Sequence, residues 1–350
     1  MEVVREVTVA AGPGAAHRAW PSIERANDGG LVVAYKVGPD HHKTDDGVVW
    51  VARSEDGGLT WPFRRPVVAE PGWDVFTHHG LTRLADGSLL LHCVRARHLG
   101  AQEAGDAGEG AFFARGAFIR SADGGRTWGP CGPKLEMPFI SATGRGFCYG
   151  KVQEQAGGAL IVPFYGTPAE RTDELQRILA IVRSDDGGRS WREYSFISAD
   201  PSSPLRPSET DLLRLGDGRL LAVVRANGRK RLYRAWSADD GLSWSGLEPT
   251  PMPGQSPALL ALESGAILCA YRARTAEAFG MSCAVSEDEG ATWQVLGSLY
   301  SGDSSDCAYP SMVKLPDGTV CCAFYTSPRQ TADGPDSEIR GLVIADRTSM

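Results

Sequence analysis

Long hydrophobic runs are missing from this chain of 350 residues, and with them the usual signature of a membrane protein. No apolar stretch approaches the about 20 residues that a membrane-spanning helix requires. The N-terminal segment MEVVREVTVAAG has no basic stretch followed by an apolar one. We therefore expect a cytoplasmic protein, with secretion left open because a signal could have been removed. A net charge of -7 argues against nucleic acid as a partner.

Cysteine pairs of the metal-binding kind are also missing. The eight cysteines form no C-x-x-C pair in a metal-ligand context, and most lie in strand-like segments. The adjacent Cys321 and Cys322 should point to opposite faces of one strand. We expect buried free thiols in a reducing compartment, with disulfides as the alternative, and we predict no metal or cofactor.

What the chain does have is repetition. The pattern Ser-x-Asp-x-Gly-x-(Thr/Ser)-Trp occurs five times, at residues 54–61, 121–128, 184–191, 237–244 and 286–293. Self-similarity at such a period is typical of a propeller or a solenoid. Asp and Ser side chains fold back on backbone amides, Gly supplies positive φ, and Trp packs on the adjoining apolar layer. Each copy is therefore predicted to be a structural hairpin turn and not part of a metal or catalytic array.

A second repeat raises the count to six. An apolar strand, a turn ending in Gly and another apolar strand recur around Gly29, Gly87, Gly158, Gly218, Gly265 and Gly318. This predicts an all-β, six-bladed β-propeller formed as a single domain by residues 1–350. The sixth blade lacks the Ser-x-Asp turn, and the N-terminal run at residues 2–10 is predicted to supply its outer strand. Such closure removes exposed strand edges.

The innermost strands of a propeller line its central tunnel, and the loops at one rim form a concave site. Nine residues before the six glycines stand Trp20, His78, Tyr149, Glu209, Ser256 and Tyr309. Seven residues after them stand Lys36, Val94, Tyr165, Arg225, Arg272 and Tyr325. A purely structural ring should consist of small or apolar residues. The observed side chains indicate a polar site on the axis.

Together, the repeats and two further segments resemble the sialidase (neuraminidase) superfamily over nearly the whole chain. SETDLLRLGDGRLLAVVR is similar to the family's fourth-blade segment, in which a Glu opens the inner strand and an Arg ends the next. AYPSMVKLPDGTVCCAFY is similar to the sixth-blade segment with the nucleophilic Tyr. The resemblance implies that Glu209 is a base, Arg225 binds the substrate and Tyr309 is the nucleophile.

These residue types suit the chemistry of that family. Its substrate carries a carboxylate on the anomeric carbon, so an attacking carboxylate would meet a like charge. A neutral phenol avoids this repulsion, but its pKa of about 10 requires a base such as Glu209. Arginines would hold the substrate carboxylate through bidentate hydrogen bonds, and an acid must protonate the leaving oxygen.

The other arginines of the family fit less closely. In HRAWPSIER, Arg18 stands one place further from the proline than in the family's Arg-Ile-Pro segment. Arg18 is therefore predicted to contact the substrate, with a solvated rim charge as the alternative. No arginine opens the strand that leads into the fifth Ser-x-Asp turn. Arg272 and Arg274, at the end of the preceding strand, are predicted to replace it, Arg272 being the better placed.

The general acid of the family is an Asp in the loop after the second strand of blade one. Here that loop is VGPDHHKTDDGVVW, and the candidates are Asp40, Asp45 and Asp46, unless all three are solvated loop residues. Two histidine pairs could converge on the same rim, with a metal or a structural role as the alternatives to substrate contact. The further residues predicted to contact the substrate are His41, His42, His78, His79 and Tyr149.

The sequence thus predicts an exo-acting glycoside hydrolase of the sialidase type, which cleaves a terminal, acidic sugar with retention through a covalent Tyr309 intermediate. The incomplete arginine set means that the sugar need not be sialic acid, and another acidic sugar or a neutral sugar stays open. Two alternatives stay open: a polysaccharide lyase acting on uronic-acid-containing glycans, and a carbohydrate-binding propeller without catalysis. The expected partner is a glycan or a small sugar, with neither nucleic acid nor a membrane, and the oligomeric state stays open.

Overall fold

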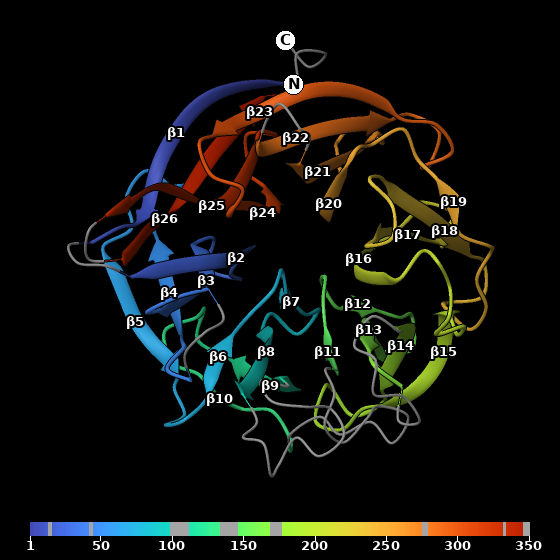
Figure 1. The fold of residues 1–350 in the computed structure, drawn as a ribbon, viewed down its shortest axis with the longest axis horizontal. Coiled ribbons are helices and arrows are strands. Elements are labelled where there is room, and N and C mark those ends of the chain that lie inside the picture. The colour runs from blue at the N-terminus through green and yellow to red at the C-terminus, as the bar shows by residue number, and fades with distance from the viewer. Residues whose placement is uncertain are drawn as a thin grey trace.

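Six antiparallel sheets stand in a closed ring in the computed structural model of the protein (Figure 1). The structure describes residues 1–12, 16–41, 45–98, 112–133, 146–168, 177–274, 279–331 and 334–345. Every helix or strand assigned within these ranges is a β-strand, so the prediction of an all-β, six-bladed propeller is confirmed. No helix in the described part of the chain is long and apolar enough to cross a membrane.

Each blade runs from an innermost strand near the axis to an outermost strand on the perimeter (Figure 1). Blade one contains β2 (His17–Arg25), β3 (Leu31–Gly38), β4 (Val48–Ser54) and β5 (Phe63–Val68). Blade two contains β6 (Asp74–Phe76), β7 (Leu81–Arg83), β8 (Leu89–His98), β9 (Phe112–Ser121) and β10 (Gly129–Pro130). Blade three contains β11 (Gly146–Cys148), β12 (Gln153–Glu154), β13 (Leu160–Gly166), β14 (Ile178–Ser184) and β15 (Arg192–Ser198).

The second half of the ring is more regular, with four strands in each blade. Blade four contains β16 (Pro207–Arg214), β17 (Leu220–Ala226), β18 (Leu232–Ser237) and β19 (Glu248–Pro249). Blade five contains β20 (Gly254–Ala261), β21 (Ile267–Arg274), β22 (Phe279–Ser286) and β23 (Gln294–Gly302). Blade six contains β24 (Cys307–Lys314), β25 (Val320–Thr331), β26 (Gly334–Ala345) and β1 (Glu2–Ala10).

The N-terminal strand β1 closes the ring. It pairs with β26 in antiparallel register, from Glu2 opposite Ala345 to Ala10 opposite Ile339, as the sequence predicted for the sixth blade. Most of β1 is exposed, since it is the outermost strand, and Val9 and Ala10 are its buried residues. Backbone pairing between the two chain ends therefore removes the open edge that blade six would otherwise present.

The cysteines lie in the interior of the blades. All eight are free and buried, which confirms the expectation of free thiols. The neighbours Cys321 and Cys322 pack in two different hydrophobic clusters, because successive strand residues face opposite sides of a sheet. Burial raises the pKa of the Cys93 thiol to about 12, so this thiol stays protonated and unreactive at neutral pH.

The Ser-x-Asp turns are hydrogen-bonded as structural turns. In the first copy, Asp56 accepts hydrogen bonds from the Ser54 hydroxyl and from the Leu59 and Thr60 amides, at 2.7, 3.0 and 3.0 Å. The Trp61 indole donates to the Gly58 carbonyl at 3.2 Å. The aspartate contacts with the Ser hydroxyl and with the amide four residues on recur in the other four copies. The structural interpretation of these aspartates therefore agrees with their geometry.

These turns are expected to make the fold sensitive to acid. Hydrogen bonds, above all from the Thr60 hydroxyl, lower the pKa of Asp56 from 3.8 to about 2. A depressed pKa means that the ionised turn stabilises the fold above pH 3.8 and that this stabilisation is lost as the pH falls through about 2. The urea concentration at the unfolding midpoint, measured from pH 6 to pH 2, should decrease as the pH drops from 3.8 to about 2. The decrease should be less steep for Asp56→Asn. An equally steep fall in the variant would contradict this account.

The inner strands are interrupted at one equivalent position in every blade. Register shifts mark bulges in β2, β16, β20 and β24, and blades two and three divide the inner strand into two short segments. Trp20, Ser256 and Tyr309 have positive φ values of 53, 50 and 51° at these bulges. Each of the three precedes a proline, which cannot donate a ladder hydrogen bond and so favours a bulge. Bulges redirect side chains, here toward the axis.

Strand direction separates the two rims of the ring. Successive strands of a blade are antiparallel, so the starts of inner strands and the ends of second strands share one rim. The turn glycines and the Ser-x-Asp turns share the other rim. A hollow of about 930 Å³ on that second rim is lined by turn residues of blades one to three. The polar side chains at the inner positions that the sequence predicted to line the tunnel lie on the first rim.

Candidate functional site

Three side chains from opposite sectors of the ring meet at the axis. The Tyr309 hydroxyl, from β24, donates to Glu209 Oε1 of β16 at 2.8 Å. Arg225 Nη1, at the end of β17, donates to the same carboxylate oxygen at 2.7 Å and lies 3.4 Å from the Tyr309 hydroxyl. The structure thus brings together the three residues to which the sequence assigned the base, the arginine and the nucleophile.

The charges of this cluster are well defined. Burial alone would raise the pKa of Glu209, but the charge and hydrogen bond of Arg225 outweigh it and hold that pKa at about 2. Burial and the neighbouring Glu209 carboxylate raise the pKa of the Tyr309 phenol. At neutral pH the site therefore contains a neutral phenol that already donates its proton toward an ionised carboxylate, as a base-activated nucleophile requires.

Two more polar groups complete this cluster. The Ser256 hydroxyl donates to Glu209 Oε2 at 2.6 Å, so both carboxylate oxygens accept a hydrogen bond. The Arg272 guanidinium lies over the Tyr309 ring, 5.4 Å from its centroid. Arg225 Nε is buried and has no hydrogen-bond partner among the described residues. Two guanidinium groups therefore flank the phenol, and one of them keeps a buried donor for an anionic ligand.

Aromatic rings form one wall of the site. His78 stacks on Tyr309 with ring centroids 6.0 Å apart, and Trp20 lies 6.4 Å from Tyr309 and 4.9 Å from His78. Tyr325 lies 6.1 Å from Tyr309 on the other side. His78 is thus buried beside the nucleophile candidate, and its role as a substrate contact stays a prediction.

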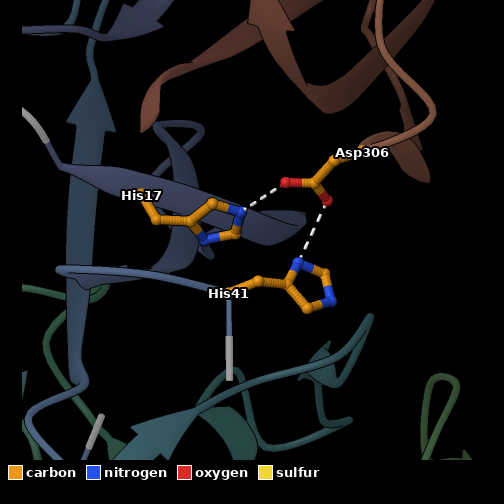
Figure 2. Close-up of side chains that lie close together, drawn as sticks. All are labelled: His17, His41 and Asp306. Atoms are coloured by element: carbon orange, nitrogen blue, oxygen red, sulfur yellow. Dashed lines mark hydrogen bonds and ion pairs between the residues drawn. The ribbon is translucent and has the colours of Figure 1, made fainter. Parts of the chain in front are cut away.

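A second polar cluster adjoins this wall, around Asp306 (Figure 2). His17 Nε2 lies 2.7 Å from Asp306 Oδ2, and His41 Nδ1 lies 3.0 Å from Asp306 Oδ1. The Tyr325 hydroxyl donates to Asp306 Oδ1 at 2.5 Å. Burial would raise the pKa of Asp306, but the hydrogen bonds and charges of the two histidines hold it well below its ordinary value. Asp306 is therefore an anion at neutral pH.

A buried ion pair holds the loop that carries His41. Lys36 is fully buried, and its ammonium group contacts the Asp74 carboxylate at 2.8 Å. The same ammonium group donates to the backbone carbonyls of Asp40 and His41, at 3.2 and 2.8 Å. All three ammonium hydrogens thus have an acceptor, and the loop backbone is held to the core of blade one.

Arg18 lies elsewhere than predicted. Its guanidinium donates to the Ala16 and Ser337 carbonyls and contacts Asp336, at 3.3, 3.1 and 3.3 Å. These partners lie in the lead-in to β2 and on β26, and none is in the Glu209 cluster. The physical reason is strand alternation, because the neighbouring His17 faces Asp306 and Arg18 must face the other side of β2. The prediction of Arg18 as a substrate contact therefore gains no support from this placement.

Two other predicted contact residues are part of the structural hub. His79 Nε2 lies 2.9 Å from Asp211 Oδ2, and both residues are buried. Asp211 also accepts from the Lys151 and Leu259 amides, at 3.1 and 2.8 Å, so it joins blades two, three, four and five. Tyr149 is fully buried, and its hydroxyl reaches the Pro257 carbonyl of blade five at 3.4 Å. We assign His79 and Tyr149 to holding the blades together.

This hub predicts a large effect on stability. Asp211→Ala removes the acceptor of several buried donors, so we expect the free energy of unfolding to fall by about 3 kcal/mol or more. Chemical denaturation would measure the change. As a control, the exposed Glu287 should tolerate Glu287→Ala within about 0.5 kcal/mol. Equal effects of the two substitutions would show that Asp211 does not hold the hub.

The loop after β3 contributes His41 to the polar cluster around Asp306. Asp40 Oδ1 accepts from the His41 amide at 2.6 Å, which is a local loop contact. Asp45 is partly exposed and Asp46 exposed. The assignment of the acid to Asp40, Asp45 or Asp46 gains no support from this placement. His42 and the side chain of Arg274 lie outside the described residues.

Sequence reasoning missed three residues of the site. Ser256 occupied the ring of inner positions but was not assigned a role, because a lone serine carries little signal. Asp306 stands three residues before Tyr309, and His17 stands beside Arg18. Their position at the starting ends of inner strands was the available signal. That signal was not sufficient, because His17 and Asp306 stand 289 positions apart in the sequence.

Fold and site together define a six-bladed propeller with a polar, arginine-lined hub. A profile of the BNR repeat-like domain matches residues 100–322, more than half of the chain. The chain therefore belongs to the BNR repeat-like family. No curated protein matches it significantly.

Solved structures share this architecture at low sequence identity. A protein of unknown function from Dyadobacter fermentans is 21% identical, with a TM-score of 0.79 and coverage of 98% of this chain and 99% of that one. The Hadza microbial sialidase Hz136 is 19% identical, with a TM-score of 0.68 and coverage of 97% and 69%. The Penicillium chrysogenum α-L-arabinanase, complexed with arabinobiose, is 13% identical, with a TM-score of 0.65 and coverage of 98% and 99%. At these identities the likeness shows a shared fold.

Proposed function

We propose that this protein is a retaining exo-glycoside hydrolase that removes a terminal, acidic sugar from a glycan. The observation that carries the proposal is the hydrogen bond from the Tyr309 hydroxyl to the Glu209 carboxylate beside Arg225. Similar folds also support the proposal, because they include sialidases and an arabinanase, all of which act on sugars. Fold similarity alone does not establish activity, so the proposal depends on the site.

The reaction follows from the charges in the site. Arg225 and Arg272 bind the substrate carboxylate and bring the anomeric carbon next to the Tyr309 oxygen. Glu209 takes the phenolic proton as the oxygen forms a bond to that carbon and the glycosidic bond breaks. Water then releases the sugar from Tyr309, and Glu209 returns the proton to the phenol. Two displacements at one carbon retain its configuration.

The test is a panel of aryl glycosides of sialic, ulosonic and uronic acids, with products analysed by mass. At least one member should release its aglycone, with the free sugar retained in configuration in the initial product. A wild-type protein that hydrolyses no member overturns the proposal. Release with inverted configuration would keep a hydrolase but exclude the Tyr309 intermediate.

A lyase is the second candidate, and one observation favours it. His78 stacks on Tyr309 and two guanidinium groups flank the phenol, which is also an arrangement for proton removal next to a neutralised uronate. The same assay separates the two reactions, since elimination yields an unsaturated product with ultraviolet absorbance and no added water. A binding protein without catalysis would bind acidic sugars with nearly unchanged affinity after Tyr309→Phe or Glu209→Gln.

A further inference from the structure

We propose that His41, oriented by Asp306, is the proton donor to the leaving oxygen and the proton acceptor for the incoming water. The assignment rests on the proposed function and gives it an acid, which Tyr309 and Glu209 do not supply. In the first step the His41 imidazolium gives its Nε2 proton to the glycosidic oxygen as the carbon–oxygen bond breaks and its electrons pass to that oxygen. In the second step neutral His41 takes a proton from the attacking water.

The geometry of His41 is that of an oriented acid–base group. Its Nδ1 lies 3.0 Å from Asp306 Oδ1, and its ring packs edge-on against Trp20 with centroids 4.8 Å apart. Its backbone carbonyl accepts from the Lys36 ammonium at 2.8 Å. Figure 2 shows the second ring nitrogen pointing away from Asp306. The His41 side chain is 36% exposed, so a substrate has access to it.

Neighbouring groups hold in place the carboxylate that orients His41. Asp306 is an anion, and the Tyr325 hydroxyl and His17 hold its carboxylate in place. Burial, acting against the Asp306 contact, lowers the pKa of His17, so His17 is the neutral partner. The ammonium group of the nearby Lys36 is paired with Asp74. An imidazole held by a carboxylate on one nitrogen keeps the other nitrogen in the correct form for proton transfer.

His41 and the nucleophile candidate both pack near the same indole ring, that of Trp20. The Trp20 ring lies between the two groups, with centroids 4.8 Å from His41 and 6.4 Å from Tyr309. Asp306 and Tyr309 stand three residues apart in sequence, at the start of β24. Both clusters therefore lie at one rim of the tunnel, around the buried Trp20 ring.

The same three residues have the atoms to hold a divalent cation, since their ligand atoms all lie within 4.8 Å of one another. Two observations favour the proton-transfer role. His17 Nδ1 is buried without a hydrogen-bond partner among the described residues, whereas a metal-bound imidazole normally donates its other N–H to an acceptor. The Tyr325 hydroxyl also occupies the oxygen of Asp306 that faces His41. With Nε2–H of His17 donating to Asp306, Nδ1 is an unprotonated acceptor, and the His17 ring leaves no donor unpaired.

The test compares leaving groups. The probes are the 4-nitrophenyl and methyl glycosides of the sugar acid that the wild-type protein hydrolyses fastest. Nitrophenolate leaves without protonation, whereas methanol requires an acid. We expect His41→Gln to reduce kcat/KM about 10²- to 10⁴-fold on the methyl glycoside and less than about tenfold on the nitrophenyl glycoside. Asp306→Asn should give the same selectivity, and Asp303→Asn, at an exposed carboxylate of the same segment, should leave both rates unchanged.

Each other outcome has a defined meaning. Equal losses on both glycosides, or no loss on either, overturn the role of His41 while wild-type hydrolysis still supports the proposed function. Selective loss in Asp46→Asn but not in His41→Gln assigns the proton to the loop carboxylate instead. Activity removed by a chelator and restored by zinc chloride replaces the proton-transfer role with a metal site. A wild-type protein that hydrolyses neither glycoside overturns this assignment together with the proposed function.

Discussion

Tyr309→Phe is expected to lower kcat on a hydrolysed aryl glycoside by on the order of 10⁴-fold or more, as removal of a catalytic nucleophile does. The substitution removes the attacking oxygen and little else, because the ring keeps its contacts with His78 and Trp20. Glu209 keeps its hydrogen bonds from Arg225 and Ser256, so the fold should persist. Steady-state kinetics and circular dichroism of the same preparation would measure both effects.

The chain offers a matched control for this experiment. Tyr271 is also a buried tyrosine, and its hydroxyl has no hydrogen-bond partner among the described residues. Tyr271→Phe should therefore leave turnover unchanged. A loss of less than about tenfold is smaller than the contribution of a catalytic group. Such a result for Tyr309→Phe would exclude a covalent intermediate on Tyr309.

Glu209→Gln is expected to affect both catalysis and stability. Loss of the base should reduce kcat about 10²- to 10⁴-fold. The same change leaves the buried Arg225 guanidinium without its counter-charge, which should lower the free energy of unfolding by about 3 kcal/mol. Enzyme kinetics and urea denaturation measure the two effects separately. Glu193, exposed on the outer strand β15, provides the control, and Glu193→Gln should change neither quantity.

The pKa of Glu209 determines whether stability rises or falls with pH. The folded-state pKa of Glu209 is about 2, below the 4.5 of an ordinary Glu, because Arg225 more than offsets the cost of burial. The ionised pair therefore stabilises the fold fully above pH 4.5, and this stabilisation is lost as the pH falls through about 2. In Glu209→Gln, stability should depend less on pH in that window. An unchanged pH profile would mean that the pair contributes nothing to folding.

Much of the site could be predicted because it repeats with the blades. The turn glycines give each blade a common origin, and counting from them selected Glu209 and Arg225 from blade four and Tyr309 from blade six. The count holds because the inner strands carry their bulge at the same position. A ring fold places equivalent positions around one axis, so residues far apart in sequence meet there.

The misplaced residues show where such counting fails. Arg18 and His17 are adjacent, and which of them faces the site depends on the register of β2 against β3. The Asp40–His41 loop takes its conformation from the buried Lys36 ammonium, a contact that no repeat encodes. His79 and Tyr149 have the residue types of a binding site but are used to join blades, since the hub of a ring also needs polar contacts.

The amino-acid sequence by itself determined the number of blades, the closure of blade six by residues 2–10, and the set of polar side chains directed at the axis. Periodicity carries that information because each blade repeats one local pattern. The tertiary structure alone decided which of those side chains touch, and it brought Asp306 between His17 and His41. The physical reason is that such contacts depend on where the closed ring and its loops place distant segments, and no local pattern specifies that distance.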